Sequence, residues 1–317
     1  MPTENPAPPT RLNLLLLAAA SAGSFALLWL ATQALGNGSS SGPWRWPVAL
    51  LAALGFSFSA NTLFALLHEA VHGSFARQRT LNRWAGRWAA LWFPTSFLVQ
   101  QAYHLTHHRH NRSPAEQFDV LRPGDARWLK YAQWYAIYTG LYWLVALAGL
   151  LAYALTPRAA RRWLLRRMGQ PAAAQTSANH YAEALERVPA LASRLEIAAA
   201  IGLHAALLTW GGIAPLAWVL CYAAFALQWS WLQYTDHAFS PLNDRHGAWN
   251  LRVNRFTRAM FLNYHLHLAH HQRPELPWNA LPRHATPGPR FIDVWLACWR
   301  GPRPAHRFPR FAQGPVC

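Results

Sequence analysis

Long apolar stretches alternate with short polar ones along the chain. Residues 14–35 and 47–67 are each long enough to cross the roughly 30 Å hydrocarbon core of a bilayer as a helix. Residues 196–210 and 213–234 are separated by a Gly-Gly pair at residues 211–212, which predicts a helical hairpin that turns at the glycines. The pattern therefore predicts an all-α polytopic membrane protein with about four transmembrane helices.

Two further apolar stretches are interrupted, and neither is a simple span. Residues 84–103 are short and contain Pro94, which predicts a dipping or interfacial helix. Residues 131–155 are long enough to cross, but residues 157–168, with five arginines, would then lie outside the cell, against the positive-inside rule. We favour a re-entrant or interfacial helix with a break near Gly140, because it keeps these arginines in the cytoplasm.

The charge distribution supports one orientation of the spans. The net charge is +17, yet only 13% of the residues are charged, about half the share of a soluble protein. When four spans follow a cytoplasmic amino terminus, only Arg45 of the 29 basic residues falls in a far-side loop. The other arginines lie beside apolar stretches with tryptophans between them, which suits an anionic membrane surface better than nucleic acid. We expect membrane lipids as neighbours and no nucleic-acid partner.

The whole chain, residues 1–317, is predicted to form one membrane domain. Residues 1–11 are Pro-rich and predict a flexible amino terminus. Residues 283–317 are rich in Pro and Arg and predict a cytosolic tail, with one helix at residues 290–299. The three cysteines form no spaced motif, so neither a disulfide framework nor a thiolate metal site is expected.

Three histidine clusters are the most specific feature of the sequence. The first has two histidines four residues apart, and the other two repeat the spacing His-x-x-His-His. On a helix these spacings put the imidazoles of one cluster on one face, a turn apart, where they can bind a metal. The clusters are His68 and His72; His104, His107 and His108; and His267, His270 and His271.

Eight imidazoles are more than one metal needs, because four-coordinate zinc takes three or four protein ligands. They indicate two metals that lie close together. Imidazole suits zinc, copper, nickel and iron, so the ligand type alone does not choose the metal. A site beside membrane spans favours a metal that attacks apolar substrates, which points to iron and O2.

In this order, and beside such spans, the clusters resemble the three histidine boxes of the membrane-bound fatty acid desaturase family, from about residue 56 to residue 282. The resemblance implies four transmembrane helices that hold a cytosolic histidine-rich cap with a di-iron centre. It also implies a further ligand after the last span, which His237 matches, and Gln233 stands where some members have an asparagine that ligates through water. The implied metal ligands are His68, His72, His104, His107, His108, His237, His267, His270 and His271.

The resemblance further implies an oxidoreductase that uses O2 and an external electron donor, ferredoxin-like or other, to desaturate a fatty acyl chain. The substrate would be an acyl-lipid or an acyl thioester. Desaturation is expected because it dominates the family. A hydroxylase or a carotenoid ketolase is the alternative, and residues 271–278 followed by Leu281 and Pro282 resemble carotenoid ketolases as well as bacterial desaturases. We expect an integral protein of a bacterial inner membrane, with the histidine boxes on the cytoplasmic side.

Two other classes of protein compete with this interpretation. The segment from His68 through Glu69 to His72 also matches the His-Glu-x-x-His motif of zinc metalloproteases, in which the glutamate is the general base. An intramembrane protease would leave the two His-x-x-His-His clusters unexplained. The histidines of a metal transporter would line a path inside the spans, whereas these lie at helix exits and in loops.

The remaining polar residues are assigned by position. His265 should face away from the metals, and His110 is expected in a loop. His204, inside a span, should be neutral and bonded to a backbone carbonyl. Three carboxylates could orient ligand histidines or offset the charge of the metals: Glu69, Asp119 and Asp236. Four histidines are expected at the surface: His180, His246, His284 and His306.

Overall fold

The computed structural model describes residues 6–36, 42–160, 163 and 177–311. In these ranges the secondary structure is helical, and the only extended pairings are three isolated β-bridges. The prediction of an all-α fold is confirmed.

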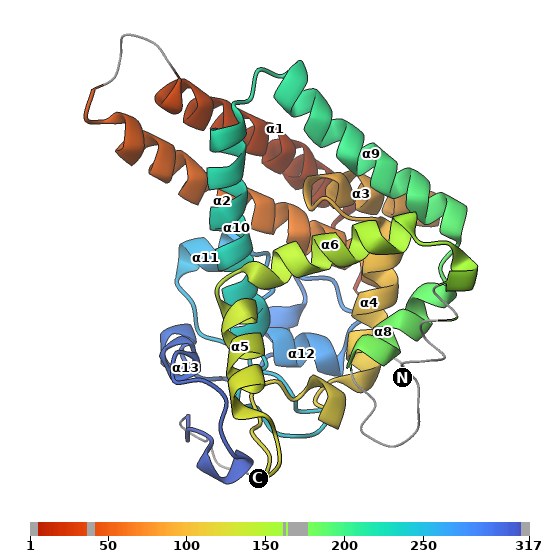
Figure 1. Cartoon of the computed structure of the whole chain (residues 1–317), viewed down its shortest axis with the longest axis vertical. Coiled ribbons are helices and arrows are strands. Elements are labelled where there is room, and N and C mark those ends of the chain that lie inside the picture. The colour runs from red at the N-terminus through yellow and green to blue at the C-terminus, as the bar shows by residue number, and fades with distance from the viewer. Residues whose placement is uncertain (1–5, 37–41, 161–162, 164–176, 312–317) are drawn as a thin grey trace.

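Four of the described helices are long and apolar enough to cross a membrane, as predicted. Figure 1 shows them towards one end of the molecule, with most of the shorter helices gathered towards the other. A hairpin turn joins the last two near Gly211, also as predicted. The four are α1 Thr10–Leu35, α2 Arg45–His72, α9 Ala190–Thr209 and α10 Pro215–Thr235.

Helix α2 is the central helix of this bundle. In its most apolar 18-residue window, 72% of the residues are buried inside the protein, against 28% for α1 and α9. α1 packs along it through small side chains, and Ser24 Oγ donates a hydrogen bond to Ser59 Oγ at 2.9 Å. Small residues allow such close approach in lipid, where apolar burial gives helices little reason to associate. α2 ends at Gly73, whose φ of +81° favours glycine, so His68 and His72 lie in its last two turns.

Two helices, α3 Arg79–Trp92 and α4 Phe97–His110, replace the single interrupted helix predicted for residues 84–103. The break contains Pro94, which has no backbone N–H to continue a helix. The Glu196 carboxylate of α9 holds the break, because it accepts hydrogen bonds from Ser96 Oγ at 2.6 Å and from the Leu98 N–H at 3.0 Å. α4 therefore starts in a fixed direction.

The predicted break near Gly140 is confirmed. Helices α5 Arg127–Tyr138 and α6 Leu141–Leu155 meet there at 91°. Gly140 has φ of +86°, and a Cβ at this position would lie 3.1 Å from the Leu227 backbone nitrogen of α10. Only glycine fits both conditions without strain. Most of the arginine-rich stretch, residues 157–168, lies outside the described residues.

The short helices form the histidine-side part of the molecule (Figure 1). α13 Phe291–Cys298 confirms the helix predicted at residues 290–299. Its Val294 is buried with Trp134 and Tyr138 of α5, so the carboxyl-terminal segment packs against the bundle as far as this helix. The other short elements are η1 Pro114–Glu116, α8 Ser177–Glu186, α11 Arg255–Met260, α12 His267–Gln272, η2 Leu281–Arg283 and η3 Ala305–Arg307.

The histidine inside a span is bonded as expected. His204 Nε2 donates to the Leu91 carbonyl of α3 at 3.1 Å, and His204 Nδ1 accepts from Trp218 Nε1 at 3.1 Å. Both ring nitrogens are thus satisfied by a neutral imidazole, which joins α9 to α3 and α10.

Candidate metal centre

The ends of three helices and one loop position the clustered histidines. The first pair lies in the last two turns of α2, the second cluster in the last two turns of α4, and the third on α12. His237 follows α10 directly. α12 has only six residues, and Asn250 fixes its start, because the buried amide oxygen accepts a hydrogen bond from the Ala269 N–H at 3.0 Å.

The structure brings all nine predicted histidines together in two groups. Within each group the facing ring nitrogens lie within 4.8 Å of one another. Among the described residues, these are the groups of histidine, cysteine and carboxylate side chains that could hold a metal ion. The five-histidine group comprises His68, His72, His104, His108 and His270. The four-histidine group comprises His107, His237, His267 and His271.

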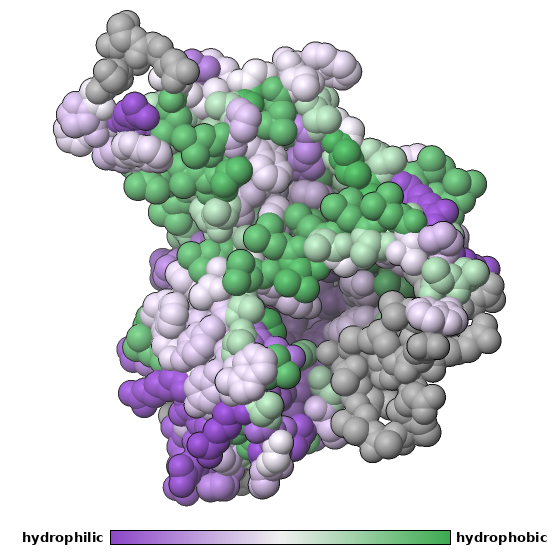
Figure 2. All heavy atoms as spheres, in the orientation of Figure 1, coloured by the Kyte–Doolittle hydropathy of each residue, from purple (hydrophilic) through white to green (hydrophobic). Residues whose placement is uncertain are grey.

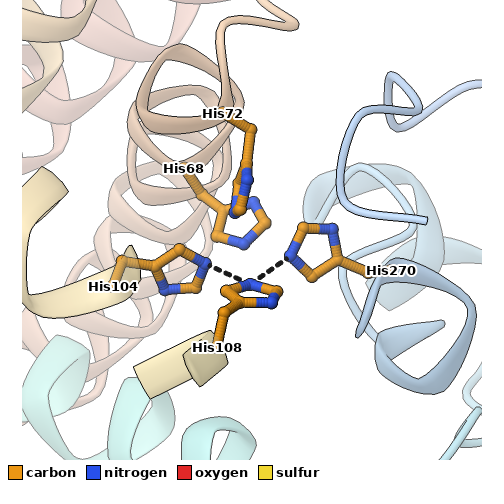
Figure 3. Close-up of side chains that lie close together, drawn as sticks. All are labelled: His68, His72, His104, His108 and His270. Atoms are coloured by element: carbon orange, nitrogen blue, oxygen red, sulfur yellow. Dashed lines mark hydrogen bonds between the residues drawn. The ribbon is translucent and has the colours of Figure 1, made fainter. Parts of the chain in front are cut away.

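Figure 3 shows the five-histidine group, with rings from α2, α4 and α12 turned towards one another. His108 Nε2 lies 3.0 Å from both His104 Nε2 and His270 Nε2. The Nε2 atoms of His68 and His72 are buried and have no hydrogen-bond partner. Buried ring nitrogens without a partner are costly unless something binds them, and a metal ion fits this donor set.

The four-histidine group is built in the same way. His107 Nε2 lies 3.1 Å from His237 Nε2, and His271 Nε2 lies 3.1 Å from His267 Nε2. The two groups are neighbours, because the rings of His108 and His271 stack with their centroids 4.2 Å apart. The arrangement suits two metal ions close to each other.

Partners on the outer ring nitrogens of two histidines set which of their nitrogens faces the four-histidine group. His107 Nδ1 donates to Glu116 Oε2 at 2.8 Å, and His237 Nδ1 donates to the Gly247 carbonyl at 2.7 Å. With the proton on Nδ1, the Nε2 lone pair of each ring is free to bind a metal. The Asp236 carboxylate lies 3.6 Å from His267 Nδ1, and burial raises the pKa of Asp236 well above its ordinary value.

The electrostatics of the site favour neutral imidazoles. Burial, followed by the charges that neighbouring histidines would carry, lowers the pKa of His270 and His271 well below the ordinary value. The same causes lower the pKa of His108 to about 2. Since a metal binds the deprotonated nitrogen, these rings are already in the ligand form at neutral pH.

Of the three carboxylates singled out from the sequence, only Asp236 lies near a ring nitrogen. Glu69 is buried and accepts hydrogen bonds from Ser74 Oγ at 2.8 Å and the Trp278 N–H at 3.1 Å. Asp119 forms a paired contact with Arg112 at 2.7 and 2.9 Å. Glu116, which does bond a clustered histidine, was not predicted: it lies in the three-residue helix η1, and its spacing from His107 follows no motif.

The other histidines lie outside both groups, as expected. His265 is buried near the third cluster, but its ring is not part of either group. His110 ends α4 rather than lying in a loop, and its ring stacks on His180 with centroids 3.7 Å apart. His180 is half-buried, and three histidines are exposed: His246, His284 and His306.

A cavity of about 370 Å³ reaches both histidine groups. Its inner wall includes His104 of the five-histidine group and His107 and His237 of the four-histidine group. Gln233 also lines it, with its amide bonded to the Tyr264 hydroxyl at 2.9 Å. The rest of the wall is rich in aromatic side chains: Phe93, Tyr103, Phe118, Trp134, Tyr142, Tyr181, Trp229 and Tyr234.

The family model described as fatty acid desaturase matches residues 41–291, which is more than half of the chain and includes every clustered histidine. No curated protein matches the chain. The chain belongs to the fatty acid desaturase family.

Proposed function

We propose that this member of the fatty acid desaturase family is a membrane di-iron oxidoreductase that uses O2 and an external electron donor to desaturate a fatty acyl chain. The observation that carries the proposal is that two adjacent groups of histidines, with facing nitrogens within 4.8 Å in each, border one aromatic-lined cavity. A large apolar pocket with a few convergent polar groups is the usual form of a substrate site.

In this proposal the nine clustered histidines would hold the two irons, and the irons would supply the activation of O2 that removal of hydrogen from an unactivated methylene requires. The overall reaction balances when O2 takes two electrons from the donor, two hydrogen atoms from the substrate and two protons from water. One carbon–carbon single bond becomes a double bond, and two water molecules leave. The protein holds the acyl chain against the histidines and keeps water out of the cavity.

The electrons come from a separate protein in this proposal, ferredoxin-like or of another kind. Exposed arginines near the carboxyl terminus and the start of α5, among them Arg127, Arg300 and Arg307, give that part of the surface a positive charge. The same region is strongly hydrophilic in Figure 2. An acidic donor would be steered to such a surface, and this supports a cytoplasmic position for the histidine side.

The protease alternative lacks support in the site. His68 and His72 lie in a group with three further histidines, rather than with one additional ligand. The Glu69 carboxylate, which would be the general base, is engaged by Ser74 and the Trp278 backbone. A hydroxylase or ketolase of the same family would use the same histidines, so only the product separates these activities from desaturation.

The test is a lipid profile of a bacterial host that expresses the chain, compared with a host that expresses His270→Ala. The proposal predicts acyl chains with an additional double bond in the first host and none in the second. Hydroxylated or keto products would support the alternatives within the family. Unchanged lipids from a chain that is present with its metals would contradict the proposal.

A further inference from the structure

The mouth of the aromatic-lined cavity lies along α6. Four residues of this helix line the cavity, and their spacing places them on one helix face: Tyr142, Val145, Ala146 and Gly149. Val145 lines the cavity and is 63% exposed, so the cavity meets the surface of the molecule at this side chain. Gly149 is exposed too, and a Cβ placed there would meet nothing within 4 Å.

The surface around this mouth is apolar. α6 contains no charged residue, and its outward side chains include Leu141 and Leu144, which are 50% and 53% exposed. Figure 2 shows the hydrophobic surface of α6 above a recess in the middle of this face. An apolar surface of this kind is stable against lipid and costly in water.

Contacts with the candidate spans fix the position of α6 along the axis of the bundle. Trp143 stacks on Tyr222, in the middle of α10, with ring centroids 5.6 Å apart. Tyr153, near the other end of α6, has its hydroxyl 3.4 Å from Ser193 Oγ in the first turn of α9. The helix therefore crosses the half of the bundle nearer the histidines, and the mouth opens at the depth of lipid chains rather than beyond the ends of the spans.

The inner end of the cavity is more polar than its mouth. There it is lined by His104, His107 and His237, together with Glu116 and the Tyr181 hydroxyl that donates to Glu116 at 2.7 Å. Among the described residues that line the cavity, the one guanidinium belongs to Arg112, and it is buried and paired with Asp119. The described wall thus offers no free cation to the phosphates that water-soluble acyl thioesters carry.

We infer that acyl chains enter the cavity sideways from the bilayer, beneath α6, so that the substrate is an acyl chain of a membrane lipid rather than a water-soluble acyl thioester. This inference rests on the proposed function, because it names the substrate of that reaction. Entry of an acyl chain into the cavity can nevertheless be measured without turnover. A lipid whose headgroup stays at the interface can insert a chain at an apolar mouth at this depth. A soluble thioester would have to cross the lipid-facing surface to reach it.

The test uses the full chain in phospholipid vesicles that contain a phosphatidylglycerol with a photoreactive diazirine in the middle of one acyl chain. Irradiation followed by peptide mass spectrometry should locate crosslinks on cavity residues such as Tyr142 and Trp229. In Gly149→Phe, and separately in Val145→Trp, the bulky side chain should obstruct the mouth and reduce these crosslinks at least tenfold. The matched control is Gly202→Phe, because Gly202 is also a mid-helix glycine with nothing within 4 Å of its Cβ position, and it does not line the cavity.

Crosslinks that persist undiminished in both mouth variants would overturn the inference. So would labelling of the cavity by a photoreactive acyl thioester of coenzyme A added in the water phase, with no labelling by the vesicle lipid. Thermal unfolding of each variant in detergent checks that a lost crosslink does not reflect a misfolded chain. Crosslinking by lipid together with unchanged host lipids would contradict the proposed function alone.

Discussion

Two of the clustered histidines are held in their orientation by hydrogen-bond partners on their outer nitrogens. His107 donates to a buried carboxylate and His237 to a backbone carbonyl, so both rings present Nε2 to the site. Partners of this kind commonly tune metal affinity roughly 10–100-fold. We therefore expect Glu116 to contribute to metal binding through the ring that it orients.

Replacing Glu116 tests this role. In Glu116→Ala, His107 Nδ1 loses its acceptor, so we expect iron affinity to fall roughly 10–100-fold with the fold retained. Iron retained by the purified chain during titration with a chelator is the measurement. Glu116→Gln is the matched control, since its amide oxygen can still accept the hydrogen bond, and equal losses in the two variants would count against an orienting role.

A second residue-scale prediction compares two buried histidines on one segment. His267 belongs to the four-histidine group, whereas His265, two positions earlier, belongs to neither. His267→Ala should lower the iron content and abolish activity, while His265→Ala should keep most of its iron. If the His265 variant lost its iron and the His267 variant kept it, the assignment of ligands would be wrong.

At this scale, the spacing of histidines predicts that the rings of one cluster share a helix face. It does not predict how they divide between the two groups, since His104 and His108 lie in one group and His107 in the other. The sequence does not predict which carboxylate supports them. Glu69 lies within the first cluster along the chain, and Asp119 is only three residues beyond Glu116. Their partners are nevertheless Arg112, Ser74 and backbone groups.

At the scale of elements, the bend between α5 and α6 depends on one residue. Gly140 has a positive φ and packs against the α10 backbone, with its Cβ position 3.1 Å from Leu227 N. This bend directs α6 across the bundle, where it forms one wall of the cavity.

Gly140→Ala should therefore destabilise the protein, by about 1–2 kcal/mol for the left-handed backbone alone, with the close contact adding to it. The measurement is the midpoint of thermal unfolding in detergent, which should fall by several degrees. Gly202→Ala is the control, because its Cβ position is open and alanine favours a helix, so its midpoint should not fall. Equal midpoints for wild type and Gly140→Ala would contradict the packing described for the bend.

The sequence predicts the breaks between helices where glycine or proline restricts or frees the backbone. Gly140, Pro94 and the Gly-Gly pair at residues 211–212 each end a helix nearby. The sequence does not predict that two separate helices flank Pro94. Their separation depends on Glu196, about a hundred residues away, which holds the break and sets the direction of α4. α12 is similarly set by tertiary contact, because six residues are too few for a helix to be stable alone and Asn250 holds it.

At the scale of the whole molecule, the four candidate spans put all three clusters at one end, and we propose from the positive-inside rule that this end faces the cytoplasm. The loop between α1 and α2 should then lie on the opposite side. Length and hydropathy are enough to predict the four candidate spans, whereas the path of the cavity depends on side chains from α4, α6, α8 and α10 together.

Cysteine labelling tests the orientation. In a Cys317→Ser background, in which Cys221 and Cys298 are buried, a membrane-impermeant maleimide added to intact cells should label Gly42→Cys. It should label His306→Cys only after the cells are opened. Labelling of His306→Cys in intact cells would place the carboxyl-terminal side outside and contradict the orientation.

Separate segments of one chain bring their imidazoles together in two groups, which we propose hold two metal ions. The most direct measurement is the metal content of the purified wild-type chain from iron-replete cells. We expect two iron ions per chain, one for each histidine group. A single zinc ion per chain, with no iron, would contradict it and favour the metalloprotease interpretation.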